Sequence, residues 1–361
     1  MSKDWTISQP RESLLKVSDY QKEKHLVRTF MAAFEKADTA ELTSILSKHT
    51  SVDYLWRGMH PFYEQDGARN VVENFWLPLR ASFTSLERRE DIFFAGDNIA
   101  SEEKSIPGIW TCSMGHFRGL HDQQWLGIPP TRKVAHIPYA EFHRIEDGLI
   151  TESALFIDIV KVMQQSGLNP FPHQTGACFI HPGPKTHDGI LTNHYDPKEG
   201  KDTIELLNRM IDDLSALNQS GEDRCPPEWL ARTWRDDMTW YGPGGIGAAY
   251  TIPRYQEQHQ YPFREGLTDK SYNGHVTRFA EGNYACFFGW PNLNNRNIGW
   301  LGLPKGDHPL AEMRVVDVYR RDGDKLAENW VFIDVPYYLM QHGIDLLKNP
   351  NALKELHGAQ S

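Results

Sequence analysis

The chain alternates between stretches with helical spacing of apolar residues and stretches with strand-like alternation. Leu26, Phe30 and Phe34 recur at helical spacing, and an amphipathic pattern returns at 203–217. Strand patterns separated by turn residues close each half of the chain. We therefore expect helices followed by a strand-rich region, and we expect this order twice.

The clearest repeat joins residues 140–167 to residues 316–343. Asp158 matches Asp334 at an offset of 176 (334 − 158), and both lie in the tripeptide Phe-Ile-Asp. Each copy predicts a strand, a tight turn at an Asp-Gly dipeptide, a second strand and a short terminal helix. The acidic residue inside an otherwise apolar strand is the strongest chemical lead in the sequence.

Further landmarks repeat in the same order. Residues 53–58 match 237–242 at an offset of 184 (237 − 53), and Trp-Leu-Gly-Ile-Pro at 125–129 matches Trp-Leu-Gly-Leu-Pro at 300–304. Ordered landmarks with so long a period indicate a tandem duplication of a whole domain, because solenoid repeats are much shorter.

The repeats divide the chain into five parts. We predict a polar leader at 1–20, a first domain at 21–168, a linker rich in Pro, Gly and His at 169–200, a second domain at 201–348 and a tail at 349–361. A length of 361 residues agrees with two domains of ordinary size.

Composition excludes several classes of protein. The formal net charge of −10, without a long basic run, disfavours nucleic-acid binding. No apolar run reaches the length of a membrane span and no secretory signal is visible, so we expect no membrane association. Four widely separated cysteines are typical of a reduced, cytoplasmic protein.

The linker histidines allow a metal site as an alternative. Their spacing matches no common ligand pattern, so we expect a plain linker and no metal. The four residues are His173, His181, His187 and His194.

The ordered motifs resemble those of a known family. The Trp-Leu-Gly-Ile/Leu-Pro loop, the Asp-Gly hairpin, the strand with Glu and Asp six residues apart and the Gln-x-Gly tail are similar to those of SnoaL-like polyketide cyclases, within the NTF2-like (cystatin-like) superfamily. The resemblance covers about 20–168 and 203–347. It implies an α+β fold: two tandem cone-shaped barrels, each with N-terminal helices packed on a curved antiparallel sheet.

The resemblance also implies an activity that needs neither metal nor cofactor. In this family an Asp of the last strand acts as general acid and base in an aldol ring closure, or in related isomerase or lyase (dehydratase) chemistry. Carried over, the catalytic residues are Asp158 and Asp334. Such a carboxyl needs an apolar cavity that raises its pKa, so that it can take a proton from carbon and return it. The expected substrate is a small, largely apolar carbonyl compound.

Family members place a polar Gln-x-His pair on the neighbouring strand. The matching positions here are Glu141 and His143 in the first unit, and Asp317 and Tyr319 in the second. The resemblance thus adds His143 as a catalytic residue and the other three as substrate contacts. The first unit keeps the set closer to the family pattern, Asp158 with His143.

Aromatic residues complete the predicted substrate contacts. Trp56 and Trp240 replace an Asn of the family near the first strand of each unit. Strand alternation puts Phe156 on the same face as Asp158, and Trp330 on the same face as Asp334.

Each of these interpretations has an alternative. Asp158 and Asp334 would equally suit helix caps or partners of backbone amides. The chain as a whole would suit a non-catalytic small-molecule-binding protein of the same fold. Because such units often pair through the outer face of the sheet, we expect an intramolecular pseudo-dimer, or a dimer of such monomers.

Overall fold

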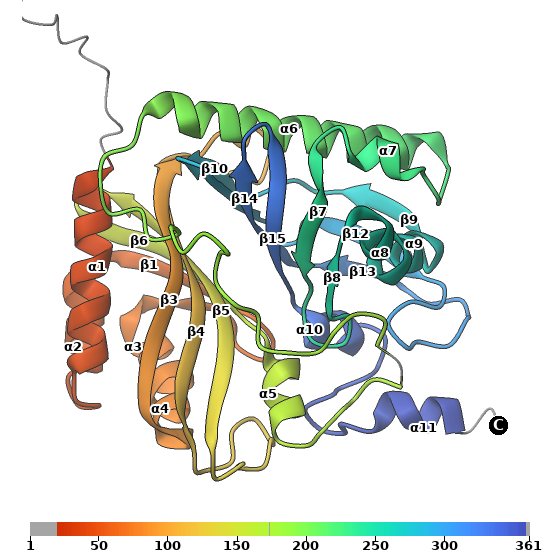
Figure 1. The fold of residues 1–361 in the computed structure, drawn as a ribbon. Helices are drawn as coiled ribbons and strands as arrows, with labels where there is room; N and C mark the ends of the chain where they lie inside the picture. Colours follow the sequence, from red (N-terminus) through yellow and green to blue (C-terminus); the bar gives the residue numbers. More distant parts are fainter. Residues whose placement is uncertain (1–19, 173, 359–361) are drawn as a thin grey trace, which may run out of the picture.

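A computed structural model describes residues 20–172 and 174–358. The first half of the chain forms helices packed on one curved sheet (Figure 1). The strand order is β2-β1-β6-β5-β4-β3, with β1 parallel to β6 and the other pairs antiparallel. The elements of this first unit are α1 (Gln21–Lys36), α2 (Leu42–His49), β1 (Thr50–Gly58), β2 (Tyr63–Asp66), α3 (Gly67–Val71), η1 (Val72–Trp76), α4 (Leu77–Ser82), β3 (Phe83–Asp97), β4 (Ile109–His121), β5 (Val134–Glu146), β6 (Leu149–Ile157) and α5 (Ile159–Gln165).

The second half repeats this architecture with shorter strands. Its main sheet has the matching order β8-β7-β15-β14-β11-β10, and a separate three-stranded sheet has the order β13-β12-β9. The elements of this second unit are α6 (Pro197–Ser220), α7 (Pro227–Leu230), β7 (Trp234–Tyr241), β8 (Ala248–Tyr250), α8 (Ile252–Tyr255), η2 (Gln256–Gln260), α9 (Tyr261–Glu265), β9 (Leu267–Tyr272), β10 (Thr277–Glu281), β11 (Tyr284–Phe288), β12 (Leu293–Asn297), β13 (Leu310–Met313), β14 (Val315–Asp322), β15 (Lys325–Ile333) and α10 (Val335–Met340), followed by α11 (Ala352–Gly358). The predicted fold class, two tandem α+β units with helices packed on a curved sheet, is confirmed.

Helix α6 begins earlier than the sequence pattern suggests. Its first residue is Pro197, and the side chain of Asp196 caps it by accepting from the backbone N–H of Lys198 at 2.9 Å. An Asp before a Pro is a strong helix start. The boundary predicted at residue 200 therefore falls inside this helix.

The segment before α6 crosses both units. Ile190 forms a bridge to Phe93 of the first unit, and Ala177 forms a bridge to Ala248 of the second. Its backbone thus finds partners on both sheets, which holds the segment against the body of the molecule.

The outer faces of the two sheets pack against each other. Phe142 lies 4.7 Å from Phe288 between ring centroids, and Phe94 lies 5.3 Å from Phe279. All four rings belong to the buried core. The two units therefore form an intramolecular pair joined by an aromatic layer, in which burial of apolar surface provides the attraction.

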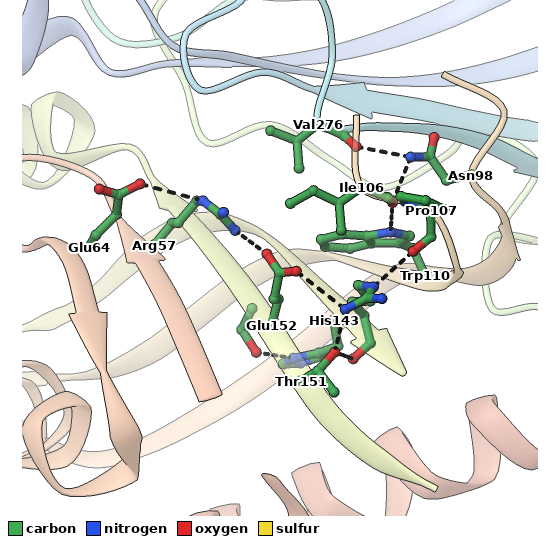
Figure 2. Close-up of polar contacts among 12 residues, drawn as sticks. Arg57, Glu64, Asn98, Ile106, Pro107, Trp110, His143, Thr151, Glu152 and Val276 are labelled. Carbon is green, nitrogen blue, oxygen red and sulfur yellow. Dashed lines mark hydrogen bonds and ion pairs between the residues drawn. The ribbon is translucent and has the colours of Figure 1, made fainter. Parts of the chain in front are cut away.

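Polar contacts fix the register of this pair. The Asn98 side chain donates to the backbone carbonyl of Val276 at 3.0 Å (Figure 2). Lys24 of α1 contacts Glu281 of β10 at 2.5 Å, and the second oxygen of Glu281 accepts from the backbone N–H of Ala95 at 2.9 Å. Both charged side chains are almost completely buried, so each depends on the other.

We predict that Lys24→Met lowers the free energy of unfolding by about 3–5 kcal/mol, because it leaves the Glu281 carboxylate buried without its counter-ion. Urea denaturation followed by tryptophan fluorescence measures this. Arg69→Ala is the control: it removes an exposed pair with Glu73 at 3.8 Å and should cost less than about 1 kcal/mol. Equal losses in the two variants would contradict the importance of the buried pair.

Candidate functional site

The second unit encloses the roomier of the two cone cavities. Helix α6, helix η2 and the inner face of the main sheet surround a space of about 280 Å³. Much of its wall is aromatic: Trp240, Tyr255, Phe263, Phe287 and Tyr319. A concave, mostly apolar wall with few polar groups is the usual form of a small-molecule site.

Asp317 is the acidic residue in this wall. Strand alternation on β14 turns Asp317 inward together with Val315 and Tyr319. Its Oδ1 accepts from the Tyr319 hydroxyl at 3.0 Å and from the Asn329 amide at 3.1 Å. Its Oδ2 has no hydrogen-bond partner among the described residues, and the side chain is half-buried along the cavity.

The surroundings of Asp317 change its acidity. Burial raises the pKa of its carboxyl to about 7, although the hydrogen bonds from Asn329 and Tyr319 act in the opposite direction. Near neutral pH the two protonation states are therefore similarly populated. A carboxyl in this condition can accept a proton and give it back.

The other titratable groups of the wall include two histidines. His259 stacks on Trp240 with ring centroids 3.9 Å apart, and His275 stacks on Phe287 at 4.0 Å. Burial lowers the pKa of each imidazole to about 3, with the Arg278 charge adding to the effect on His275. Both rings are neutral at physiological pH and can each donate one hydrogen bond.

The cavity of the first unit is largely filled. It measures about 30 Å³, enough for about one water molecule. Three of the residues predicted from the sequence line it: Trp56, Glu141 and His143. The matching cavity of the second unit is lined by the predicted Trp240, Asp317 and Tyr319.

An arginine fills the first cavity. The Arg88 guanidinium lies 2.7 Å from Glu141 and close to the rings of Phe117 and Tyr139, 4.8 and 4.7 Å from their centroids. Burial raises the pKa of Glu141, but the charges and hydrogen bonds of Arg88 and His143 together outweigh it and bring the pKa to about 2. Glu141 is thus a fixed anion, unlike Asp317.

The second unit has no arginine at the matching position. At the position matching Arg88 (272 − 88 = 184) it has Tyr272, whose hydroxyl donates to Glu102 at 2.7 Å. The exchange of one residue removes the buried cation from the cavity. Arg88 lines the smaller cavity and Tyr272 lines the larger one.

His143 has a hydrogen-bonded position in the first cavity. Its Nδ1 lies 2.7 Å from the Ser153 hydroxyl, and its Nε2 lies 3.7 Å from Glu141. Of the predicted set of Asp158 with His143, only His143 lines the cavity. The catalytic role of His143 stays a prediction.

Asp158 and Asp334 lie at the junction of the two units, outside the lining of both cone cavities. Asp158 caps α5 by accepting from the backbone N–H of Lys161 at 3.0 Å, and its other oxygen accepts from Gly244 of the second unit at 2.8 Å. Burial raises the pKa of this carboxyl.

Asp334 makes the same two kinds of contact, with the roles of the two units exchanged. It caps α10 by accepting from Tyr337 at 3.2 Å, and its other oxygen accepts from His60 of the first unit at 3.0 Å. His60 and Gly244 differ by the repeat offset of 184 (244 − 60). These contacts favour the structural alternative for both carboxylates, and their catalytic role stays a prediction.

Phe156 and Trp330 lie on the outer faces of their sheets. Phe156 contacts Phe288 and Trp290 of the other unit, with centroids 5.8 and 5.6 Å away. The Trp330 indole donates to the carbonyl of Pro182 at 2.9 Å and stacks on Tyr241. Neither lines a cone cavity, because alternation turns the residues beside them inward.

Sequence reasoning missed several residues of the second cavity. Asn329, Val331 and Ile333 of β15 line it, on the strand face opposite Trp330. The same period-2 alternation contained this signal, with an Asn between apolar residues. His259 and Tyr255 on the helical segment gave no motif that distinguishes them from ordinary core residues.

The described residues hold no cluster of three or more His, Cys, Asp or Glu suited to a metal ion. Of the linker histidines, His181 contacts the Lys161 ammonium at 2.5 Å, and His173 lies outside the described residues. Over 20–172 and 174–358, no helix is long and apolar enough to cross a membrane.

Comparison with known proteins gives matches among solved structures only. No family model and no curated protein matches the chain. The chain is similar to SnoaL-like polyketide cyclases and NTF2-like proteins. One match is a candidate SnoaL-like polyketide cyclase from Jannaschia sp. CCS1, with 17% identity over 44% of this chain and 96% of that one, at a TM-score of 0.30.

Two further matches are of the same kind. IdmH, a candidate polyketide cyclase from Streptomyces antibioticus, has 18% identity over 39% of this chain and 97% of that one, at a TM-score of 0.29. An NTF2-like protein from Anabaena variabilis ATCC 29413 has 14% identity over 38% and 92%, at 0.30. At these identities the likeness concerns the fold alone, and no argument about activity rests on it.

We predict that Arg88→Met lowers the free energy of unfolding by about 3–5 kcal/mol, because Glu141 then stays buried as an unpaired charge. The double variant Arg88→Met/Glu141→Leu should recover most of this loss, since it removes both charges. Chemical denaturation of the wild type and the three variants, including Glu141→Leu, completes the cycle. Additive losses in the double variant would contradict direct coupling.

We also predict a pH dependence from Asp334. Burial raises the pKa of its carboxyl to about 6, so between pH 4 and 6 the folded state binds more protons than the unfolded state. The contribution of Asp334 to stability should therefore fall as pH rises through this window, by about 2–3 kcal/mol, and level off above it, while Asp317, with a pKa of about 7, titrates in both the wild type and the variant. Asp334→Asn should flatten this part of the curve in denaturation at stepped pH; an unchanged slope would contradict the raised pKa.

Proposed function

We propose that the second unit carries the active site of a cofactor-independent acid/base enzyme that acts on a small, largely apolar carbonyl compound. One observation supports this most: Asp317 has a free carboxylate oxygen in an aromatic cavity of about 280 Å³, with its pKa raised to about 7. Proton transfer at carbon needs a carboxyl of this kind.

Two neighbouring side chains orient the carboxylate of Asp317. Tyr319 and Asn329 both donate to Oδ1, which orients the carboxyl and leaves Oδ2 as the basic atom. In the proposed reaction Oδ2 removes a proton from the carbon next to the substrate carbonyl. The same oxygen then gives the proton to the alkoxide that ring closure forms, to another carbon in an isomerisation, or to the departing hydroxide in the loss of water.

The aromatic wall contributes in two ways. It binds an apolar skeleton by removing its surface from water. It also keeps water away from the carboxyl, which maintains the raised pKa through burial. The resemblance noted in the sequence supports the same chemical class, although it assigns the acid to Asp158 and Asp334. We move the role to Asp317 because Asp317 lines the open cavity.

We predict that the protein accelerates hydrogen–deuterium exchange at C1 of 2-tetralone, a bicyclic ketone with an acidic C–H group next to its carbonyl. NMR in D₂O measures the rate. Because the carboxylate is the basic form, the enzyme-dependent rate should rise with pH through about 7 and level off above it. Asp317→Asn should lower this rate by about a hundredfold or more.

Asp158→Asn is the matched control, since this buried carboxyl lies outside the cavity lining, and the rate should persist in the folded variant. Exchange that is lost in Asp158→Asn but kept in Asp317→Asn would refute the assignment. Tight binding of 2-tetralone without any exchange in the wild type would instead favour the non-catalytic binding protein.

A further inference from the structure

Two amide nitrogens in the wall of the second cavity have no hydrogen-bond partner among the described residues. They are Nδ2 of Asn292 and Nε2 of Gln260. Each side chain is only 4% exposed. Buried donors are nearly always paired in proteins, because an unpaired donor loses its hydration without compensation.

The orientation of the Asn292 amide follows from its other contact. Its Oδ1 accepts from the backbone N–H of Val315 at 2.6 Å. A backbone N–H can only donate, so the oxygen must face Val315 and the NH₂ group is left over. In Gln260 the oxygen accepts from the Cys225 thiol at 3.6 Å, and Nε2 is the amide atom without a partner among the described residues.

The first unit has no counterpart of the Gln260 donor. At the repeat offset of 184, Gln260 matches Trp76 and its neighbour His259 matches Phe75. Two aromatic residues stand beside the filled cavity where two polar residues stand beside the open one. The unit with the larger cavity is therefore also the unit with polar residues at these two positions.

The charge of the wall points to a neutral ligand. The Arg264 guanidinium donates to the Asn218 side chain and to backbone carbonyls, those of Leu217, Glu222 and Asp223. Four of its five N–H groups are thus engaged by protein groups. Asp317 disfavours an anion further, and the two histidines of the wall are neutral.

We propose that Asn292 and Gln260 determine ligand specificity by donating hydrogen bonds to acceptor oxygens, such as carbonyl or ether oxygens, of a neutral ring compound. This inference rests on the proposed function, because it concerns the same cavity. It adds a requirement that apolar packing cannot provide: a ligand without acceptors leaves the two donors unpaired and binds more weakly.

The test compares two probes of the same skeleton, 2-tetralone and tetralin, which lacks the carbonyl. Displacement of the fluorescent dye N-phenyl-1-naphthylamine measures both dissociation constants. In the wild type we expect 2-tetralone to bind about tenfold more tightly than tetralin, as one hydrogen bond of ordinary strength allows.

The variants Asn292→Leu and Gln260→Met remove the donors at nearly constant volume and add no ionisable group. Asn292→Leu also removes the oxygen that accepts from the N–H of Val315, so circular dichroism checks that the variant is folded before binding is measured. In the double variant the preference for 2-tetralone should disappear while the tetralin constant stays within about twofold. The single variants show which donor binds the carbonyl.

A wild-type preference that persists in the folded double variant overturns the specificity assignment and leaves the proposed function standing. The variant Val331→Trp fills the cavity with an indole ring and tests whether the cavity is the ligand site. If the dye binds this variant as well as the wild type, the cavity is not the ligand site, and the proposed function falls together with the inference.

Discussion

Two buried carboxylates, each bonded to backbone amides of both units, set the arrangement on which the rest of the molecule depends. Asp158 and Asp334 each cap a helix of their own unit and accept one N–H from the other unit. The contact is demanding: a Cβ on Gly244 would lie 2.7 Å from the Cβ of Val160, so glycine is required there. This reciprocal bonding gives the Phe-Ile-Asp sequence of each unit a structural role at the junction.

Once the two units are held back to back, their cavities open on opposite sides of the aromatic layer and can diverge. The first is filled by Arg88, whose charge is balanced by Glu141. The second keeps its space and leaves Asp317 with neutral partners. Glu141 and Asp317 occupy matching strand positions (317 − 141 = 176), yet their pKa values lie near 2 and near 7. Glu141 lies beside Arg88 and His143, which lower its pKa, whereas Asp317 has only the neutral partners Asn329 and Tyr319 to oppose the effect of burial.

The fold could be predicted from the sequence because the repeat recurs at many separate landmarks, and each landmark has local turn or helix chemistry. The site could be predicted only in part. Asp317, Tyr319 and Trp240 were identified as substrate contacts, but the acid was sought in Asp158 and Asp334. From sequence alone, a carboxylate buried against backbone amides looks like one buried in a cavity. Only the three-dimensional pairing, the N–H of Gly244 on Asp158, distinguishes them.

The polar residues of the second cavity suggest why the chain retains both units. Beside the open cavity, His259 and Gln260 replace the aromatic pair Phe75 and Trp76, so this unit gives up apolar packing and carries unpaired donors. Polar residues in the wall of a ligand site often lower the stability of the folded protein in this way. The first unit has the opposite character, with a filled cavity and a buried ion pair, and its outer sheet face contacts the second unit through the aromatic layer. We infer that the first unit serves as the scaffold that lets the second keep a cavity open.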